Sequence, residues 1–418
     1  MQPILYNFPM AVKANLNRKV LITFILITNI TLLYGQDFKT IGYLPYYRFG
    51  ASELIAYEKL THLNIAFGYP DAAGNISVGG QDITMVVSLA HEQEVEVFLS
   101  IAGGSSTTQQ NWLNLLQPQN RSAFIQKLVS FTVGHNLQGI DVDLEWGDVT
   151  DNYSGFVLEL KDTMEVYGLT MTAALPGSYR YPQVSDEALE AFDWINMMVY
   201  DHTGPWAPNS PGQHSPYSKA VDAIAYWSIT QGIPTEKLTL GVPFYGYNFN
   251  DPGDVYSFTY ASIVAQDTEN ADLDQVGLAF YNGRPTIEAK TILALENLSG
   301  IMIWELGQDA FGSIVEYSLL ETIYQTIQSY FVSTETPEIG LTLNVFPNPF
   351  EDQLHVEQSG SDQTLVQLSN IHGAILWRQE VDAFQNNLDI PTQNIPAGFY
   401  ILSISDGNNI VSRKIVKQ

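Results

Sequence analysis

Residues 139–146 read GIDVDLEW, an alternation of acidic and apolar side chains that is typical of a β-strand. Successive side chains of a strand point to opposite faces, so Asp141, Asp143 and Glu145 share one face, with neighbouring carboxylates about 6–7 Å apart. Like charges this close resist full ionisation, so at least one carboxyl group is expected to keep its proton near neutral pH. A protonated carboxyl beside anionic partners can act as a general acid.

Two other interpretations of the acidic face are a solvated edge strand and a site for a hard cation bound by oxygen ligands. A solvated edge strand does not need the continuous apolar face that Ile140, Val142 and Leu144 provide. A calcium-binding loop needs turn glycines inside the acidic run, and residues 140–146 contain none. The pattern therefore favours a catalytic strand.

The same run resembles the DxxDxDxE signature of glycoside hydrolase family 18, which contains chitinases and endo-β-N-acetylglucosaminidases. Asp141, Asp143 and Glu145 match the last three acidic positions, whereas Gln138 occupies the first. Because Gln138 precedes the three acids, we expect this departure to remove a supporting contact and to leave the chemistry intact.

The length and composition indicate a globular protein with one large domain and one smaller domain. The chain has 418 residues, of which 45% are hydrophobic and 15% charged. Its net charge of −27 argues against nucleic acid, anionic membranes and acidic polysaccharides as partners, whereas a neutral glycan is not repelled. The absence of cysteine excludes disulfides, thiolate metal sites and a cysteine nucleophile.

Residues 1–35 resemble a secretory signal peptide. Three basic residues precede the apolar run 20–33, and the small residue Gly35 offers a cleavage site. The alternative, a membrane anchor, is disfavoured because this run is short for a transmembrane helix. We therefore expect a protein that is secreted, to the medium or the cell surface, after cleavage of the signal.

Residues 36–331 alternate short β-rich runs with segments of helical period, as parallel α/β proteins do. The predicted strands are 40–44, 62–67, 96–101, 139–145, 169–174, 194–200, 238–243 and 300–304. This count predicts a (β/α)8 barrel, the TIM barrel. Catalytic groups of such barrels lie at the C-terminal ends of the strands, where Glu145 is expected.

Other predicted strand ends resemble elements of the same family. Residues 100–104 (SIAGG) resemble its SxGG element with one extra residue, although any tight turn also favours glycine here. Residues 198–201 (MVYD) fit its MxYD element, which implies that Tyr200 points into the barrel mouth and donates a hydrogen bond. Simple packing is the alternative for this tyrosine.

Aromatic residues near strand ends are candidates for substrate binding. Trp206, on the loop 204–217, can stack on a sugar because pyranose C–H faces pack well on aromatic rings. Trp304 resembles the tryptophan that forms the floor of the family's reacting-sugar subsite, with core packing as the alternative. The full set of predicted substrate-binding residues is Tyr43, Phe67, Gly103, Gly104, Met198, Trp206, Tyr245 and Trp304.

The resemblance implies substrate-assisted hydrolysis with retention of the anomeric configuration. Glu145 protonates the glycosidic oxygen, while the sugar's own 2-acetamido carbonyl attacks the anomeric carbon and gives an oxazolinium ion. Asp143 holds the acetamido N–H, and Asp141 shares a proton or hydrogen bond with Asp143. Tyr200 binds the acetamide oxygen, and Asp201 orients the acid. No metal or cofactor is expected, since the histidines are too scattered for a metal cluster. These are His91, His135, His202 and His214.

The expected substrate is β-1,4-linked N-acetylglucosamine, either as chitin or as the core of N-glycans. The loop 204–217 and residues 301–305 look more chitinase-like. A non-catalytic glycan-binding protein is the alternative, but family members of that kind usually lack the acid, whereas Glu145 is present. Residues 245–300 have room for a loop and one helix, and we expect this segment to be too short for the full α+β insertion of many relatives. We therefore predict a shallow open groove, attack within chains, and a monomer.

Residues 332–340 form a predicted linker, and residues 341–418 change to period two, which suggests an immunoglobulin-like β-sandwich. The segments 346–350 (FPNPF), 395–400 (IPAGFY) and 414–416 (KIV) resemble the C-terminal sorting domain of type IX secretion cargo. This resemblance implies the type IX machinery as a partner and a Bacteroidetes-type host. A carbohydrate-binding module is the alternative.

Overall fold

A computed structural model describes residues 38–102, 106–334, 342–350, 352–359, 364–370, 374–382, 387–396, 398–405 and 410–417. By its internal contacts the chain divides into two units, Met1–Phe331 and Val332–Gln418. The predicted signal peptide, the glycines Gly103 and Gly104, and most of the predicted linker lie outside the described residues. The last helix continues to Thr334, so the first residues of the predicted linker are helical.

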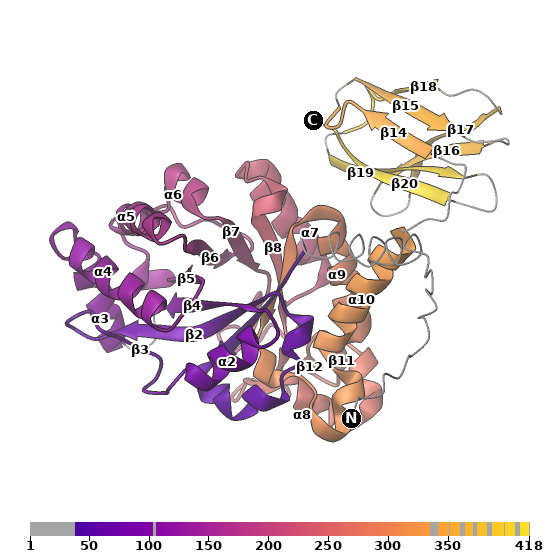
Figure 1. The fold of residues 1–418 in the computed structure, drawn as a ribbon. Coiled ribbons are helices and arrows are strands. Elements are labelled where there is room, and N and C mark those ends of the chain that lie inside the picture. The colour runs from indigo at the N-terminus through magenta and orange to yellow at the C-terminus, as the bar shows by residue number, and fades with distance from the viewer. Residues whose placement is uncertain are drawn as a thin grey trace, which may run out of the picture. The chain divides into compact units, whose positions relative to one another are not determined.

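The first unit contains a closed barrel of eight parallel strands (Figure 1). The strands are β1 (Lys39–Pro45), β2 (His62–Pro70), β4 (Glu96–Ala102), β5 (Gly139–Asp143), β6 (Thr170–Pro176), β7 (Trp194–Met198), β8 (Leu238–Pro243) and β13 (Gly300–Trp304). Strand β1 pairs with both β2 and β13, which closes the sheet, and the two-residue β3 (Ile76–Ser77) pairs antiparallel with β2. The predicted TIM barrel is confirmed.

Helices connect most successive barrel strands and cover the outside of the barrel (Figure 1). They are α2 (Thr84–His91), α3 (Ser106–Leu115), α4 (Pro118–Gly134), α5 (Tyr153–Val166), α6 (Asp186–Ala191), α7 (Tyr217–Ala225), α9 (Arg284–Asn297) and α10 (Leu319–Thr334). Between β1 and β2 the connection consists of two 3₁₀ segments, Tyr46–Leu54 and Tyr57–Lys59. Across the described ranges, no helix combines the length and the apolar character that crossing a bilayer requires.

The alternation in β5 separates the apolar residues from the acids. Ile140, Val142 and Leu144 are buried in the large core around the barrel strands, whereas the acids face the barrel interior. Strand β5 ends at Asp143, so Glu145 lies beyond it in extended backbone with φ −126° and ψ 161°. The predicted strand end at residue 145 is therefore wrong by two residues, because the extended backbone continues after the ladder pairing stops.

The segment between β8 and α9 contains a small antiparallel sheet, so the predicted loop and single helix are wrong. Its strands are β9 (Tyr245–Asn248), β10 (Tyr256–Thr259), β11 (Gln275–Val276) and β12 (Ala279–Phe280), in the order β10-β9-β12-β11. A short helix, α8 (Tyr260–Val264), follows β10. Strands of two to four residues are too short to show a clear period-two pattern in the sequence.

The second unit is built from two antiparallel sheets. One contains β14 (Thr342–Phe346), β15 (Gln353–Ser359) and β18 (Asn387–Pro391), and the other contains β16 (Thr364–Asn370), β17 (Ile375–Val381), β19 (Gly398–Ser405) and β20 (Ile410–Lys417). Side chains of both sheets, including Leu354, Ile390, Val366 and Leu402, belong to a single hydrophobic core. The predicted all-β sandwich is confirmed.

Candidate active site

A pocket of about 640 Å³ lies where the barrel strands end at their carboxyl termini. It is lined by Tyr43, Phe67, Asp143, Glu145, Trp146, Ala174, Pro176, Gly177, Ser178, Tyr179, Met198, Tyr200, Asp201, His202, Trp206 and Trp304. Most of the residues predicted from the sequence are therefore brought together. Asp141 and Tyr245 do not line the pocket. Asp141 contacts Tyr43 and Tyr245 contacts Asp201, and both of these partners do line it.

Asp141 is fully buried and accepts hydrogen bonds from four barrel strands. The hydroxyls of Tyr43 and Ser100 donate to Oδ2 at 2.6 and 2.7 Å. Thr172 Oγ1 and Asn196 Nδ2 donate to Oδ1 at 2.6 and 3.1 Å. Burial raises the pKa of Asp141, and these donors oppose the increase because they stabilise the carboxylate. Asp141 thus ties the barrel strands together beneath the pocket.

Asp143 is the next inward-facing residue of β5 and lines the pocket. Because both oxygens of Asp141 are occupied by other donors, the expected hydrogen bond between Asp141 and Asp143 is not formed. Asp143 is 5% exposed, and its Oδ1 is buried without a hydrogen-bond partner. Burial, and then the charges of Glu145 and Asp141, raise the pKa of Asp143 well above its usual range. An unpaired buried carboxyl oxygen is costly, so this side chain is prepared to accept a hydrogen bond from a ligand.

Glu145 lies in the pocket with most of its carboxyl group shielded from water. Burial, and after it the nearby charges of Asp201 and Asp148, together raise its pKa to about 7. A carboxylic acid that keeps its proton at neutral pH can protonate a leaving group. The arrangement therefore supplies a general acid next to a buried second carboxyl.

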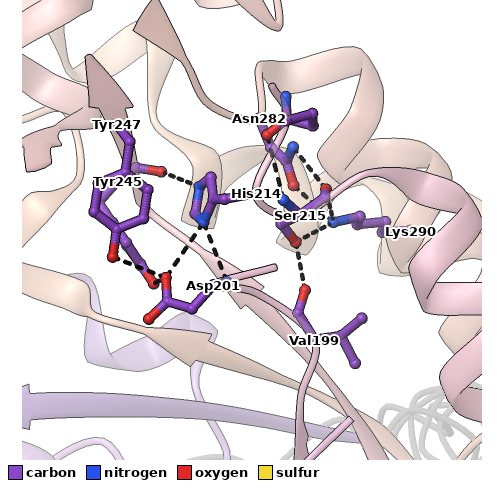
Figure 2. A network of polar contacts seen from close by, with 9 residues as sticks. Val199, Asp201, His214, Ser215, Tyr245, Tyr247, Asn282 and Lys290 are labelled. Atoms are coloured by element: carbon purple, nitrogen blue, oxygen red, sulfur yellow. Dashed lines mark hydrogen bonds and ion pairs between the residues drawn. The ribbon is translucent and has the colours of Figure 1, made fainter. Parts of the chain in front are cut away.

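Asp201 follows β7 in a left-handed backbone conformation, with φ 61°. Its Oδ1 accepts hydrogen bonds from the hydroxyl of Tyr245 and, at 3.0 Å, from that of Tyr247 (Figure 2). The Nδ1 atom of His214 lies 3.5 Å from the same oxygen. Tyr245 is thus buried behind Asp201 and contacts the carboxylate, which differs from its predicted role in substrate binding.

Aromatic rings form an apolar wall around the acids. Trp304 stacks on Phe67 with ring centroids 5.5 Å apart and an interplanar angle of 19°. Its ring centroid lies 5.6 Å from that of Tyr43. The Tyr200 hydroxyl lies 3.9 Å from Met302 Sδ. Burial raises the pKa of Tyr200 well above its usual range, so its hydroxyl keeps its proton and can donate a hydrogen bond to a ligand.

Three aromatic side chains on the pocket rim are exposed, and the sequence predicted only one of them as a site residue. Trp206, the predicted one, is 59% exposed and packs edge-on against Tyr247 at 5.7 Å. Trp146 is 74% exposed, and Tyr179 is 44% exposed. Trp146 directly follows the acidic motif and Tyr179 follows β6, so the rule that sites occupy strand ends could have identified both.

His202 also lines the pocket and was not predicted as a site residue. Burial lowers the pKa of His202, so it favours the neutral ring. In the parts of the chain that the structure describes, no three His, Cys, Asp or Glu side chains are grouped so that they could hold a metal ion.

Gln138 lies at the start of β5, at the opposite end of the barrel from the pocket. Its Oε1 accepts a hydrogen bond from Val97 N at 2.9 Å and contacts His91 Nε2 at 3.0 Å. Its Nε2 donates to Asn136 O at 2.9 Å. The amide thus makes contacts through both its acceptor and its donor. The expectation that this departure removes a supporting contact and leaves the chemistry intact stays a prediction.

Comparisons with known proteins agree with this geometry. Residues 39–309 match the family model of glycosyl hydrolases family 18. Residues 344–418 match the model of the secretion system C-terminal sorting domain. The first match covers more than half of the chain.

Several solved structures and curated proteins resemble the chain. The crystal structure of the GH18 chitinase ChiB from the chitin utilization locus of Flavobacterium johnsoniae is 45% identical, with a TM-score of 0.68, and the alignment covers 70% of this chain and 95% of that one. A chitinase from Bacteroides thetaiotaomicron is 29% identical, with a TM-score of 0.64, covering 72% of this chain and 99% of that one. A chitinase-like effector of Moniliophthora perniciosa is 28% identical over 233 residues, or 47% of this chain and 52% of that protein. The chain thus spans about half the length of this curated relative. On these grounds the chain belongs to glycosyl hydrolases family 18 and carries a secretion system sorting domain in its C-terminal part.

Proposed function

We propose that the protein is an exported chitinase that hydrolyses β-1,4 bonds between N-acetylglucosamine units, with retention of configuration. The observation that carries this proposal is the pairing of Glu145, whose pKa is raised to about 7, with the buried Asp143 in one aromatic-walled pocket. Chitinases from two bacteria share the fold, and one of them is a GH18 chitinase, which supports the choice of substrate.

The proposed mechanism assigns a separate task to each polar group of the pocket. Glu145 gives its proton to the glycosidic oxygen and then takes a proton from the incoming water. Asp143, whose Oδ1 lacks a partner, accepts the acetamido N–H. Its ionised form, which the developing positive charge favours over the protonated form, offsets the charge of the oxazolinium ion. The Tyr200 hydroxyl binds the acetamide oxygen and holds it for attack on the anomeric carbon. Burial, together with the nearby negative charge of Asp201, favours the protonated form of Glu145.

We also propose that the enzyme attacks within chains. The exposed rings of Trp146, Tyr179 and Trp206 line the pocket, and they can stack on sugars that precede or follow the reacting one. The strands of the insertion between β8 and α9 are all short, which supports a groove with a low wall. A long polymer can then bind across the site without threading its end.

The test is a time course with soluble chitooligosaccharides, with a high-mannose glycoprotein in parallel. We expect cleavage of the oligosaccharides, products of several lengths within the first minutes, and initial products in the β-anomeric form. Fully deacetylated oligosaccharides of the same lengths are the matched control, because they lack the carbonyl that the mechanism requires. Chromatography measures the product lengths, and proton NMR measures the anomer.

Each arm of this experiment can contradict part of the proposal. Release of the glycan from the glycoprotein alone would identify an endo-β-N-acetylglucosaminidase instead. Binding without cleavage of either substrate would indicate a glycan-binding protein. Early products consisting almost solely of disaccharide would argue against attack within chains.

We further propose that residues 344–418 direct export through the type IX secretion machinery, as the sorting-domain match suggests. A chain cut after Gly340 keeps the complete barrel unit Met1–Phe331 but lacks the sorting domain. This truncation is expected to accumulate in the periplasm of a type IX-secreting host, while the full chain reaches the medium or the cell surface. Fractionation and immunoblotting measure the distribution. Normal export of the truncated chain would refute this role.

A further inference from the structure

We propose that Lys290 is a positioning residue for Glu145: it anchors the loop after β7 in the conformation that keeps Asp201 beside the acid. The inference rests on the proposed function of Glu145 as the proton donor. Lys290 itself lies on α9, outside the pocket, and takes no part in the mechanism described above.

Lys290 is fully buried, and its ammonium group donates three hydrogen bonds to neutral oxygens (Figure 2). The acceptors are the backbone oxygen and Oγ of Ser215 and the Oδ1 of Asn282, each at 2.7 Å. The Nδ2 atom of Asn282 also donates to the backbone oxygen of Ser215, at 3.0 Å. Burial lowers the pKa of Lys290 to about 7. A buried ammonium is costly unless its donors are paired, so these contacts fix Ser215 strongly against α9.

Ser215 connects this anchor to the end of β7. Its Oγ donates a hydrogen bond to the backbone oxygen of Val199 (Figure 2). Val199 precedes Asp201 by two residues, so the beginning and the end of the loop 199–216 are joined at this point. Because Ser215 Oγ also accepts from Lys290, the lysine fixes the position of this junction.

His214, the neighbour of Ser215, contacts Asp201 directly. The Nε2 atom of His214 lies 3.1 Å from the carbonyl oxygen of Tyr245, which can only accept, so Nε2 carries the hydrogen. In that tautomer Nδ1 accepts a hydrogen bond from the backbone N–H of Asp201, at 3.4 Å. The backbone oxygen of His214 accepts from His202 N at 3.0 Å. The left-handed backbone of Asp201 is unfavourable for most non-glycine residues, so its conformation depends on such contacts.

The position of Asp201 matters because its charge raises the pKa of Glu145. The other titratable groups that interact with Glu145 are Asp143, Asp148, Tyr181 and Tyr200. Those that interact with Lys290 are Asp274 and His202. If the anchor is lost and Asp201 moves away, the pKa of Glu145 falls. Loss of the lysine's positive charge alone has the opposite effect, because a distant cation stabilises the Glu145 carboxylate. The direction in which the pKa of Glu145 changes therefore separates displacement of Asp201 from simple loss of the lysine's charge.

The test compares the full wild-type chain with Lys290→Met, which removes the donors and keeps a long side chain. Both proteins carry ¹³C in the glutamate carboxyl groups, and NMR follows Glu145 during a pH titration. The Glu145 resonance is assigned by its disappearance in Glu145→Gln. We expect the midpoint of Glu145 to be about one pH unit lower in Lys290→Met than in the wild type. The decrease of kcat/KM at high pH is expected to move in the same direction.

The matched control is Thr291→Val, a change at the next buried position of α9. The Oγ1 of Thr291 donates to Ile287 O within the helix, at 2.8 Å. A merely structural effect on α9 lowers the melting temperature of both variants and leaves the Glu145 midpoint unchanged. Ser215→Ala is the milder second variant if Lys290→Met does not fold, and its midpoint is expected to move in the same direction by a smaller amount.

An unchanged or higher Glu145 midpoint in a folded Lys290→Met or Ser215→Ala variant would overturn the inference. A failure of the proposed function is distinguishable from this result. In that case the wild type does not cleave chitooligosaccharides, whereas the NMR titration still reports the ionisation of Glu145 without turnover.

Discussion

Glu145→Gln is expected to lower kcat on chitooligosaccharides by about 10²–10⁴-fold, the range that general acid catalysis contributes. Glutamine keeps the size of the side chain and can still form hydrogen bonds, but it has no proton to give to the leaving oxygen. The effect is expected in kcat more than in KM, since substrate binding does not require the proton transfer. Initial rates over a range of substrate concentrations measure kcat and KM, and calorimetry measures the binding of the same oligosaccharide.

The matched control for this change is Glu92→Gln. Glu92 is exposed directly after α2 and shortly before β4 begins, so it lies at the end of the barrel opposite the pocket. Its replacement removes one negative charge in the same way and is expected to leave kcat within a factor of about two, as a surface change far from the site. If Glu145→Gln kept more than a tenth of the wild-type kcat, another group would have to supply the proton.

The sequence predicted the barrel and its acids because both depend on local patterns. The period-two alternation of residues 139–145 placed Ile140 and Val142 outside the barrel and Asp141 and Asp143 inside, as the structure has them. The barrel strands were recognisable because buried parallel strands are continuous β-rich runs separated by helical segments. The family motif located Glu145 and Tyr200 at strand ends, where the pocket lies.

Features that depend on distant contacts were not predictable in the same way. The strands β11 and β12 contain two residues each and exist only through pairing, so no periodicity indicates them. Tyr245 follows β8 and looks like a pocket residue, but Asp201 comes to lie in front of it. Lys290 looks like a solvent-exposed helix residue in the sequence. Its burial depends on Ser215 and Asn282, which supply acceptors from other segments.

Asp143→Asn is the second change with a large expected effect, a decrease in kcat of about 10²–10³-fold, comparable to the loss of one preorganised electrostatic contact. An amide keeps an oxygen that can accept the acetamido N–H, so the substrate can still bind. It cannot ionise, so it cannot offset the positive charge of the proposed oxazolinium ion. That charge develops only during the reaction and favours the ionised form of Asp143, although burial raises its pKa in the free pocket. The structure makes the charge of Asp143 effective because the side chain is 5% exposed and water cannot screen it.

The kinetic signature of Asp143→Asn follows from this division between binding and charge. We expect kcat to fall while KM changes by less than about threefold, because only the transition state loses an interaction. Asp222→Asn, a change at an exposed position of α7 that also removes one carboxylate, is the matched control and is expected to leave both constants near their wild-type values. If Asp143→Asn instead raised KM strongly and left kcat intact, Asp143 would act mainly in ground-state binding, and stabilisation of the oxazolinium ion would have to come from elsewhere in the pocket.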